Sequence, residues 1–260
     1  MVVAARAERG WPGWQPFLLI LAAMVCARTA AMGFNRIVDR RFDALNPRTA
    51  QRHLPTGRIT VTSAWVLVCL SAAGLVSAAW GINPICFRLS PVALLVVCFY
   101  SYTKRFTDFS HFFLGLALAL APLGAWLAVR GQFDWPPCVL AAAVVFWLVG
   151  FDIIYATQDH EFDKARGLRS LPVRLGIARS LRVAWAAHVI TAVLLLAFGL
   201  ISHLHMPYYV GLAVILVCLI VQHVLARKQD PVSLNVAFFR MNAVVSAVFL
   251  GGVVVDVVWR

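Results

Sequence analysis

CVLAAAVVFWLVGFDIIYAT, residues 138–157, contains a single charged side chain, Asp152. A helix that crosses the hydrocarbon core of a bilayer needs about 20 predominantly apolar residues, and this stretch has that length. Helices satisfy their own backbone hydrogen bonds in lipid over such lengths. We therefore expect an all-α fold, a polytopic bundle of about eight transmembrane helices, and a single domain over residues 1–260. The seven further apolar runs cover 15–34, 60–81, 86–102, 109–129, 182–202, 207–226 and 239–258.

The amino-acid composition excludes an ordinary soluble domain. Of the 260 residues, 62% are hydrophobic and only 13% are charged, which is too little polar surface for a water-soluble protein of this length. The formal net charge of +12 could indicate a nucleic-acid-binding protein. The basic residues, however, fall in short loops between apolar runs and not on one soluble face. We therefore expect a lipid bilayer as the partner of this chain, and no nucleic acid.

Lysine and arginine alternate between rich and poor loops along the predicted spans. The poor connections contain only Arg88 and Arg130. Cytoplasmic loops of membrane proteins carry an excess of basic residues. The pattern therefore places the rich loops in the cytoplasm and Met1 on the outer side. The rich loops are 35–59, 103–108, 158–181 and 227–238.

The stretch Asn35-Arg-Ile-Val-Asp39-Arg-Arg-Phe-Asp43 marks the point where the first apolar run meets the cytoplasm. A spacing of four residues places Asn35, Asp39 and Asp43 on one stripe of a helix. Two carboxylates one turn apart repel each other unless a cation lies between them. Mg²⁺ suits such a site, because it takes carboxylate oxygens and is usually completed by water and substrate phosphates. The alternative is a solvated helix end whose acids pair with the arginines beside them.

A second acidic stretch repeats this spacing where another apolar run meets a basic loop. Asp159 and Asp163 are again four residues apart, and Asp152 lies deeper in the same predicted helix. An unpaired carboxylate at such a depth is costly and is therefore a candidate for function. We predict that both stretches bind Mg²⁺ against a diphosphate-bearing lipid at the cytoplasmic face. Six of the chain's 11 acidic residues belong to them: Asp39, Asp43, Asp152, Asp159, Glu161 and Asp163.

Basic residues must contribute as well, because acids alone would repel a diphosphate. Arginine offers phosphate oxygens a planar fork, and lysine offers a point charge. Positive-inside topology is the competing explanation for each basic residue. Lys104 and Arg105 are favoured because they close the stretch Tyr100-Ser-Tyr-Thr-Lys104-Arg105 directly below a predicted helix. The candidates in these loops are Arg48, Arg52, Lys104 and Arg105.

Together these motifs resemble the UbiA superfamily of intramembrane aromatic prenyltransferases. The segment from Phe151 to Asp159 is most similar to the 4-hydroxybenzoate polyprenyltransferases. It is also similar to the enzymes that prenylate a naphthoate in the futalosine route to menaquinone. The matching elements stand in the family's order: N-x-x-x-D-x-x-x-D at 35–43, the segment 46–57, Tyr100 with Lys104-Arg105, D-x-x-Y-x-x-x-D-x-x-x-D at 152–163, and the segment 167–172.

The resemblance implies a role for each of these residues. Asn35 would support the first metal, Lys104 and Arg105 would neutralise the leaving diphosphate, and Asp152 and Tyr155 would line the cavity beneath. Two Mg²⁺ ions would bridge the diphosphate, held by four catalytic aspartates: Asp39, Asp43, Asp159 and Asp163.

The implied enzyme is a polyprenyltransferase of ubiquinone or menaquinone biosynthesis in the bacterial cytoplasmic (inner) membrane, with its active site facing the cytoplasm. A polyprenyl diphosphate would ionise, and a ring carbon of an aromatic acid would attack the allylic cation. The acceptor would be a 4-hydroxybenzoate-like acid or, alternatively, a naphthoate. A cation-coupled transporter is the rival class. It predicts polar residues at the mid-plane of several helices, whereas the spans outside Asp152 are almost uniformly apolar.

The chain departs from the family pattern at its start. The family usually has nine spans, and we expect that this sequence lacks a counterpart of the first, which helps to recognise the aromatic acceptor. Either the start codon is placed too late, or the acceptor pocket is altered. The acceptor, the prenyl chain length, the proton-accepting base and the oligomeric state therefore stay open. His53, His111 and His160 lie near the predicted active face, but position alone makes none of them a base.

Overall fold

Helices form the regular structure of the residues that this computed structural model describes, 1–7 and 11–258, and no strand occurs among them. The predicted all-α fold and its eight spans are confirmed, and the chain is an integral membrane protein. The helices that form the spans are α2 (Trp14–Leu45), α3 (Val61–Ile82), α4 (Pro84–Thr103), α5 (Ser110–Arg130), α6 (Trp135–Ala156), α9 (Ile177–Ile201), α10 (Met206–Ala226) and α12 (Met241–Val258). Shorter helices precede or continue them: α1 (Val2–Ala7), η1 (Thr157–Asp159), α7 (His160–Ala165), α8 (Leu171–Leu175), α11 (Pro231–Asn235) and η2 (Val236–Arg240).

Helix α2 is longer than the predicted span because the acidic stretch continues it. The apolar run ends at residue 34, but α2 continues to its C-cap, Asn46, whose N–H donates to the carbonyl of Phe42 over 3.1 Å. Pro47 follows, and proline cannot continue a helix. The first aspartate pair therefore sits on regular helix and not on a loop.

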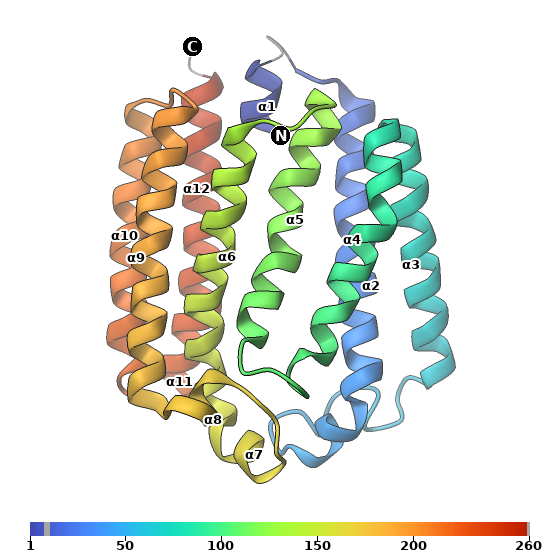
Figure 1. The fold of residues 1–260 in the computed structure, drawn as a ribbon, viewed down its shortest axis with the longest axis vertical. Coiled ribbons are helices and arrows are strands. Elements are labelled where there is room, and N and C mark those ends of the chain that lie inside the picture. Colours follow the sequence, from blue (N-terminus) through green and yellow to red (C-terminus); the bar gives the residue numbers. More distant parts are fainter. Residues whose placement is uncertain (8–10, 259–260) are drawn as a thin grey trace. The chain divides into compact units, whose positions relative to one another are not determined.

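The N-terminal unit comprises residues 12–103 and 124–132 and is built on α2, α3 and α4. Helices α2 and α3 pack along their length (Figure 1). A Cβ on Gly33 would lie 2.8 Å from Cγ2 of Val68, and one on Gly74 would lie 2.8 Å from Sγ of Cys26. Small residues permit the close backbone approach on which helix association in lipid depends. This packing supports the helix that carries the first aspartates.

The C-terminal unit comprises residues 1–11, 104–123 and 133–260 and is built on α6, α9, α10 and α12. Helix α6 packs against α9, and α10 against α12 (Figure 1). Glycines permit both contacts: a Cβ on Gly150 would overlap the ring of His188, and one on Gly252 would lie 3.3 Å from the carbonyl oxygen of Pro207. Each unit is compact in itself, and the single domain over residues 1–260 stays a prediction.

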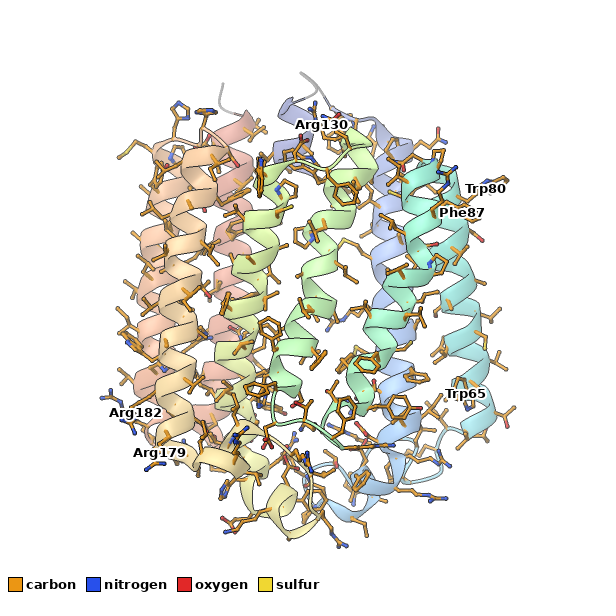
Figure 2. The ribbon with its side chains drawn as sticks, in the orientation of Figure 1. Trp65, Trp80, Phe87, Arg130, Arg179 and Arg182 are labelled. Carbon is orange, nitrogen blue, oxygen red and sulfur yellow. The ribbon has the colours of Figure 1, made fainter. Side chains whose placement is uncertain are left out.

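Side chains at the helix ends match the two interfaces of a bilayer. Trp65 and Trp80 lie at opposite ends of α3, where they are 42% and 74% exposed (Figure 2). Arg179 and Arg182 project outward from the first turns of α9 (Figure 2). Tryptophan is enriched at membrane interfaces, and long basic side chains reach from a helix end to the headgroups. The positions of these residues are those expected for membrane-spanning helices.

Candidate active site

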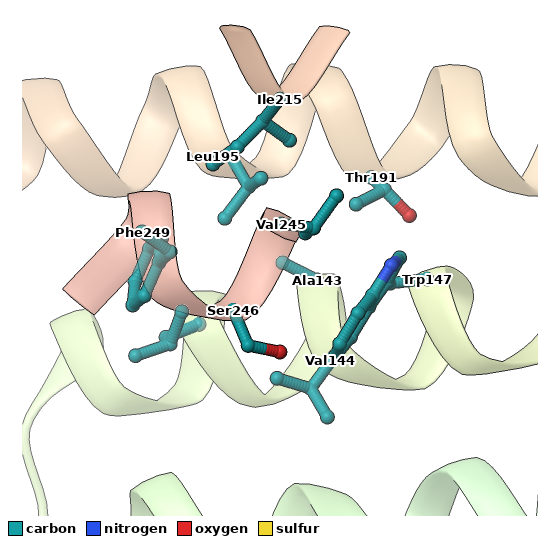
Figure 3. A pocket seen from close by; sticks show the side chains of 10 residues that line it. Ala143, Val144, Trp147, Thr191, Leu195, Ile215, Val245, Ser246 and Phe249 are labelled. Carbon is teal, nitrogen blue, oxygen red and sulfur yellow. The ribbon is translucent and has the colours of Figure 1, made fainter. Parts of the chain in front are cut away.

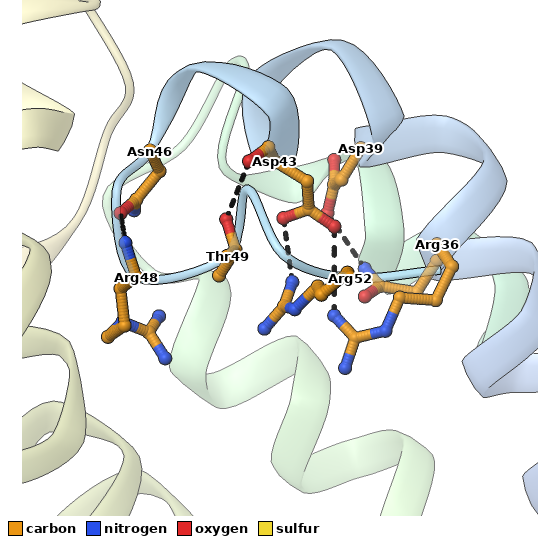
Figure 4. A network of polar contacts seen from close by, with 8 residues as sticks. Arg36, Asp39, Asp43, Asn46, Arg48, Thr49 and Arg52 are labelled. Carbon is orange, nitrogen blue, oxygen red and sulfur yellow. Dashed lines mark hydrogen bonds and ion pairs between the residues drawn. The ribbon is translucent and has the colours of Figure 1, made fainter. Parts of the chain in front are cut away.

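The first aspartate cluster lies at the C-terminal end of α2 (Figure 4). Asn35 donates from Nδ2 to Oδ2 of Asp39 over 2.9 Å. One turn later, Asp43 is only 7% exposed and faces two guanidinium groups. Nη1 of Arg52 lies 2.6 Å from its Oδ1, and Nη1 of Arg36 lies 3.8 Å from its Oδ2. The amide of Asn35 thus orients one carboxylate, while the other is charge-paired.

The turn after α2 brings Arg52 back to Asp43. The N–H of Arg48 donates to Oδ1 of Asn46 over 2.9 Å, and Oγ1 of Thr49 donates to the carbonyl of Asp43 over 3.0 Å (Figure 4). Bonds of this kind between side chain and backbone stabilise tight turns. Of the two arginines predicted to bind phosphate in this segment, Arg52 therefore contacts the cluster through its side chain. Arg48 is held in the same turn through its backbone.

The second aspartate cluster follows the C-terminal end of α6. Asp159 closes the 3₁₀ turn η1, and Asp163 lies in α7. Both residues are buried, with exposures of 7% and 3%. The sequence predicts that the apolar helix ends near residue 157 and runs into a basic loop. The structure continues the helical course beyond that point, with a tighter 3₁₀ turn between α6 and α7, as often occurs at helix ends.

Lys104 meets this second cluster from the turn that precedes α5. Its Nζ lies 3.9 Å from Oδ2 of Asp163. Arg169, in the loop after α7, fixes the turn, because its N–H donates to the carbonyl of Lys104 over 2.8 Å and its Nη1 to the carbonyl of Phe106 over 2.7 Å. The structure therefore places Lys104 beside a predicted metal ligand. Arg105 is exposed in the same turn.

An aromatic cluster lies next to the second aspartates along α6. Tyr155 stacks on Phe238 with ring centroids 4.0 Å apart and an interplanar angle of 26°, and Phe151 meets the same ring edge-on at 5.4 Å. Phe239 adds a further edge contact to Tyr155 at 6.0 Å. Phe238 and Phe239 come from η2, a π-helical turn, and such turns are rare and frequent at functional sites. The rings build an apolar wall beside the aspartates.

Two amide side chains, one of them buried, support this π-helical turn. Gln222, which is 0% exposed, donates from Nε2 to the carbonyl of Ala237 over 3.0 Å and to Oδ1 of Asn242 over 2.6 Å. Asn242 in turn donates to the carbonyl of Phe238 over 2.7 Å. Sequence reasoning missed both amides. Both are polar residues inside apolar runs, and this was the available signal. A polar side chain inside the membrane costs free energy, so such a residue usually has a functional or structural role.

A second polar pair was also missed: His111 of α5 lies 2.6 Å, Nδ1 to Oδ2, from Asp152 of α6. His188 and His223 form a further buried pair, with Nδ1 of the first 2.9 Å from Nε2 of the second. The spans thus contain more buried polar residues than the sequence pattern suggests. Each of the two histidine pairs joins side chains from two different helices.

Arg28 is another charged residue that sequence reasoning passed over. It lies inside the first apolar run, seven residues before Asn35, and its side chain is exposed. A separation of seven residues is nearly two helical turns, so Arg28 shares the α2 face of Asn35 and Asp39. An intramembrane arginine is a functional candidate by default.

A cavity of about 160 Å³ lies between α6, α9, α10 and α12 of the C-terminal unit (Figure 3). Its lining carries no charged group and is apolar apart from two hydroxyl-bearing side chains. The cavity therefore suits a hydrocarbon group and belongs to neither aspartate cluster. The lining residues are Leu140, Ala143, Val144, Trp147, Thr191, Leu195, Ile215, Val245, Ser246 and Phe249.

The donor chemistry of both aspartate clusters fits Mg²⁺. Each cluster supplies two carboxylates four residues apart. Protein sites for Mg²⁺ commonly supply one or two carboxylates and leave the other positions to water and substrate phosphates. Within residues 1–7 and 11–258, no three side chains of His, Cys, Asp or Glu converge on one point. Two carboxylates in each cluster would leave the other coordination positions to water and substrate phosphates.

The model of the UbiA prenyltransferase family matches residues 1–244 of this sequence. The chain belongs to this family. A 4-hydroxybenzoate octaprenyltransferase of Methylobacillus flagellatus is 30% identical over 245 residues, which are 94% of this chain and 82% of the relative. The enzyme of the same name from Pseudomonas aeruginosa is 32% identical over 251 residues, which are 95% of this chain and 83% of the relative.

Solved structures of UbiA homologues share the fold. The apo structure of a UbiA homologue from Aeropyrum pernix K1 has a TM-score of 0.89 and 30% identity, covering 98% of this chain and 94% of that one. A UbiA homologue from Archaeoglobus fulgidus bound to GPP and Mg²⁺ has a TM-score of 0.72 at 23% identity, covering 94% and 88%, which shows the shared fold alone. The predicted family is confirmed, this UbiA member is a prenyltransferase, and a transporter is unsupported.

Proposed function

We propose that this UbiA-family enzyme transfers a polyprenyl group from an allylic diphosphate to a 4-hydroxybenzoate-like aromatic acid, with Mg²⁺ bound by both aspartate clusters. The observation that carries the proposal is the repeated pairing of buried aspartate with a basic side chain. Arg52 lies beside Asp43, and Lys104 lies beside Asp163. The activity named for the two bacterial relatives supports the choice of acceptor.

Bound Mg²⁺ would supply charge stabilisation as the diphosphate leaves. Its proposed ligands are Asp39 and Asp43 in the first cluster and Asp159 and Asp163 in the second. Asn35 orients the carboxylate of Asp39. The proposed phosphate-binding residues are Lys104 and Arg105 beside the second cluster and Arg48 and Arg52 beside the first. They present positive charge to the diphosphate oxygens. The allylic C–O bond breaks with its electron pair on the diphosphate, and the ring carbon ortho to the phenol attacks the allylic carbon.

The aromatic wall supports this reaction by protecting the allylic cation. Tyr155, Phe151 and Phe238 present ring faces and edges where water would otherwise reach the cation. Ring faces also attract positive charge. Exclusion of water prevents the cation from being quenched to the alcohol. The basic loops support a site that faces the cytoplasm of a bacterial inner membrane.

Membranes containing the protein are expected to release diphosphate from an allylic polyprenyl diphosphate only when Mg²⁺ and an aromatic acid are both present. The measurement compares a panel of hydroxybenzoates and naphthoates. A preference for 4-hydroxybenzoate supports the proposal, and a preference for a dihydroxynaphthoate moves the enzyme to menaquinone biosynthesis. If no acid in the panel stimulates diphosphate release, the proposed function is wrong.

Arg28→Ala is expected to raise the KM for the acceptor acid roughly tenfold or more. A hydrogen bond to a charged group contributes about 1.5–3 kcal/mol, and its loss corresponds to a factor of that size. The reason is that a carboxylate acceptor needs a cation, and Arg28 shares the face of Asn35. Arg28→Lys should retain only part of the affinity for the acceptor acid, because an ammonium group lacks the planar fork of a guanidinium. Steady-state kinetics with 4-hydroxybenzoate and its uncharged amide provide the measurement. A KM change for the prenyl diphosphate alone would place Arg28 at the phosphates instead.

A further inference from the structure

His111 and Asp152 form a polar pair that neither aspartate cluster uses. His111 lies in the first turn of α5 and Asp152 near the end of α6, with Nδ1 and Oδ2 2.6 Å apart. The imidazole is 1% exposed, whereas the side chain of Asp152 keeps 19% of its surface open. The ring is therefore enclosed, whereas the side chain of Asp152 remains partly accessible.

The surroundings of the ring decide which nitrogen carries the proton. Nε2 of His111 is buried and has no hydrogen-bond partner among the residues that the structure describes. A proton on Nε2 would be a buried donor without an acceptor, which costs about 1–3 kcal/mol. The proton therefore sits on Nδ1 and is donated to Oδ2 of Asp152. In this arrangement Nδ1–H of His111 donates to one carboxylate oxygen of Asp152, and the carboxylate can accept a proton from a substrate.

The position of Asp152 along α6 places it away from the diphosphate. It precedes Asp159 by seven residues, which is about 10 Å along a helix axis. In the proposed function, a diphosphate held at Asp159 would have its allylic carbon and the attacking ring on the membrane side of the phosphates. Tyr155 lies between Asp152 and Asp159 in the sequence, near the end of α6, and belongs to the aromatic wall. That arrangement would place Asp152 at the depth of the reacting carbons.

We propose that Asp152 accepts the proton released from the acceptor's ring carbon after prenyl transfer, and that His111 is a positioning residue for Asp152. This inference rests on the proposed function. A bond forms between the ring carbon and the allylic carbon as diphosphate leaves with the electron pair of the broken C–O bond. The C–H bond at that ring carbon then breaks, its electrons restore aromaticity, and the proton passes to a carboxylate oxygen of Asp152.

A purely structural link between α5 and α6 is the competing explanation of this pair. It predicts that substitutions lower the amount of folded protein without changing which step limits turnover. The two explanations differ in the kinetic isotope effect of a 4-hydroxybenzoate that carries deuterium at both positions ortho to the hydroxyl. That effect compares two substrates on one enzyme preparation, so the fraction of folded protein does not alter it.

His111→Phe is expected to slow proton loss, so that kcat falls roughly tenfold and the deuterium isotope effect on kcat increases over that of the unsubstituted enzyme. His111→Asn places an amide N–H where Nδ1–H stood and should recover most of the lost rate and lower the isotope effect again. Asp152→Asn removes the base and should lower kcat roughly 100-fold or more. The KM for the prenyl diphosphate should change little in all three variants.

Ser110→Ala is the matched control, because Ser110 is also buried in the first turn of α5, at 5% exposure, but its Oγ makes no hydrogen bond among the described residues. It should leave both kcat and the isotope effect unchanged. An isotope effect in His111→Phe equal to that of the unsubstituted enzyme overturns the proposal, as does equal behaviour of the Phe and Asn variants. Failure of the unsubstituted enzyme to use any acceptor would instead contradict the proposed function.

Discussion

Asp39→Asn and Asp159→Asn should each lower kcat roughly 1,000-fold, since about 4 kcal/mol of metal-dependent charge stabilisation corresponds to that factor at 1.36 kcal/mol per tenfold change. Asparagine keeps the size of the side chain and an oxygen acceptor but removes the negative charge. At Asp39 that oxygen can still accept from Asn35, whose Nδ2 lies 2.9 Å from the carboxylate. Loss of activity would therefore reflect the charge and not the local fold.

Initial rates of acceptor-dependent diphosphate release measure this effect, with EDTA and graded Mg²⁺ as a second arm. Removal of the divalent metal should abolish turnover, and excess Mg²⁺ should rescue the two variants only in part. Glu161→Gln is the matched control, because Glu161 lies between Asp159 and Asp163 but has a side chain 88% exposed and is paired with His160. It should keep near-normal activity. Near-normal rates in both aspartate variants would show that the clusters do not bind the catalytic metal.

Gly150→Ala is expected to destabilise the protein by about 3 kcal/mol, within the range for overpacking a closed interior. The added Cβ would overlap the ring of His188, which is 2% exposed. That ring cannot turn aside freely, because Nδ1 contacts Nε2 of His223 at 2.9 Å and Nε2 lies 3.3 Å from the carbonyl of Trp147. Helices α6 and α9 would have to move apart. Thermal unfolding in detergent, followed by the loss of monodisperse protein, measures the change.

Gly251→Ala provides the comparison within the same unit. Gly251 lies in α12, and a Cβ there would meet nothing within 4 Å. Alanine exceeds glycine in helix propensity by about 1 kcal/mol, so this variant should be neutral or slightly stabilising. The double variant Gly150→Ala/His188→Ala lacks the overlap. It should therefore be destabilised by less than the sum of the two single variants. Equal melting temperatures of the Gly150→Ala and Gly251→Ala variants would rule out the close contact of Gly150 with the ring of His188.

The eight spans were predictable because a bilayer imposes a length and an apolar composition on every segment that crosses it. The run at 207–226, for example, differs by one residue at its start from α10, Met206–Ala226. The continuation of α2 to Leu45 was not predictable from hydropathy. Its last turns are polar, and a polar helix with an exposed end has the composition of a loop.

The candidate site was predictable where motifs repeat along one helix and not where separate helices meet. The spacing of Asp39 and Asp43 points to a shared face because the period of a helix is local. The contact of Lys104 with Asp163 joins residues far apart in the sequence. So does the stacking of Tyr155 on Phe238. Neither follows from any local period.

The sequence by itself determined the membrane class, the family and the four aspartates proposed to bind metal. Those features depend on composition and on spacing within single helices. Only the tertiary structure showed that His111, left without a role by its position, lies against Asp152, 41 residues away. It also showed a π-helical turn at Phe238, held by Gln222 through the carbonyl of Ala237, 15 residues away. Contacts of this kind depend on how helices rotate and approach, which is decided by packing over the whole unit and not by any one segment.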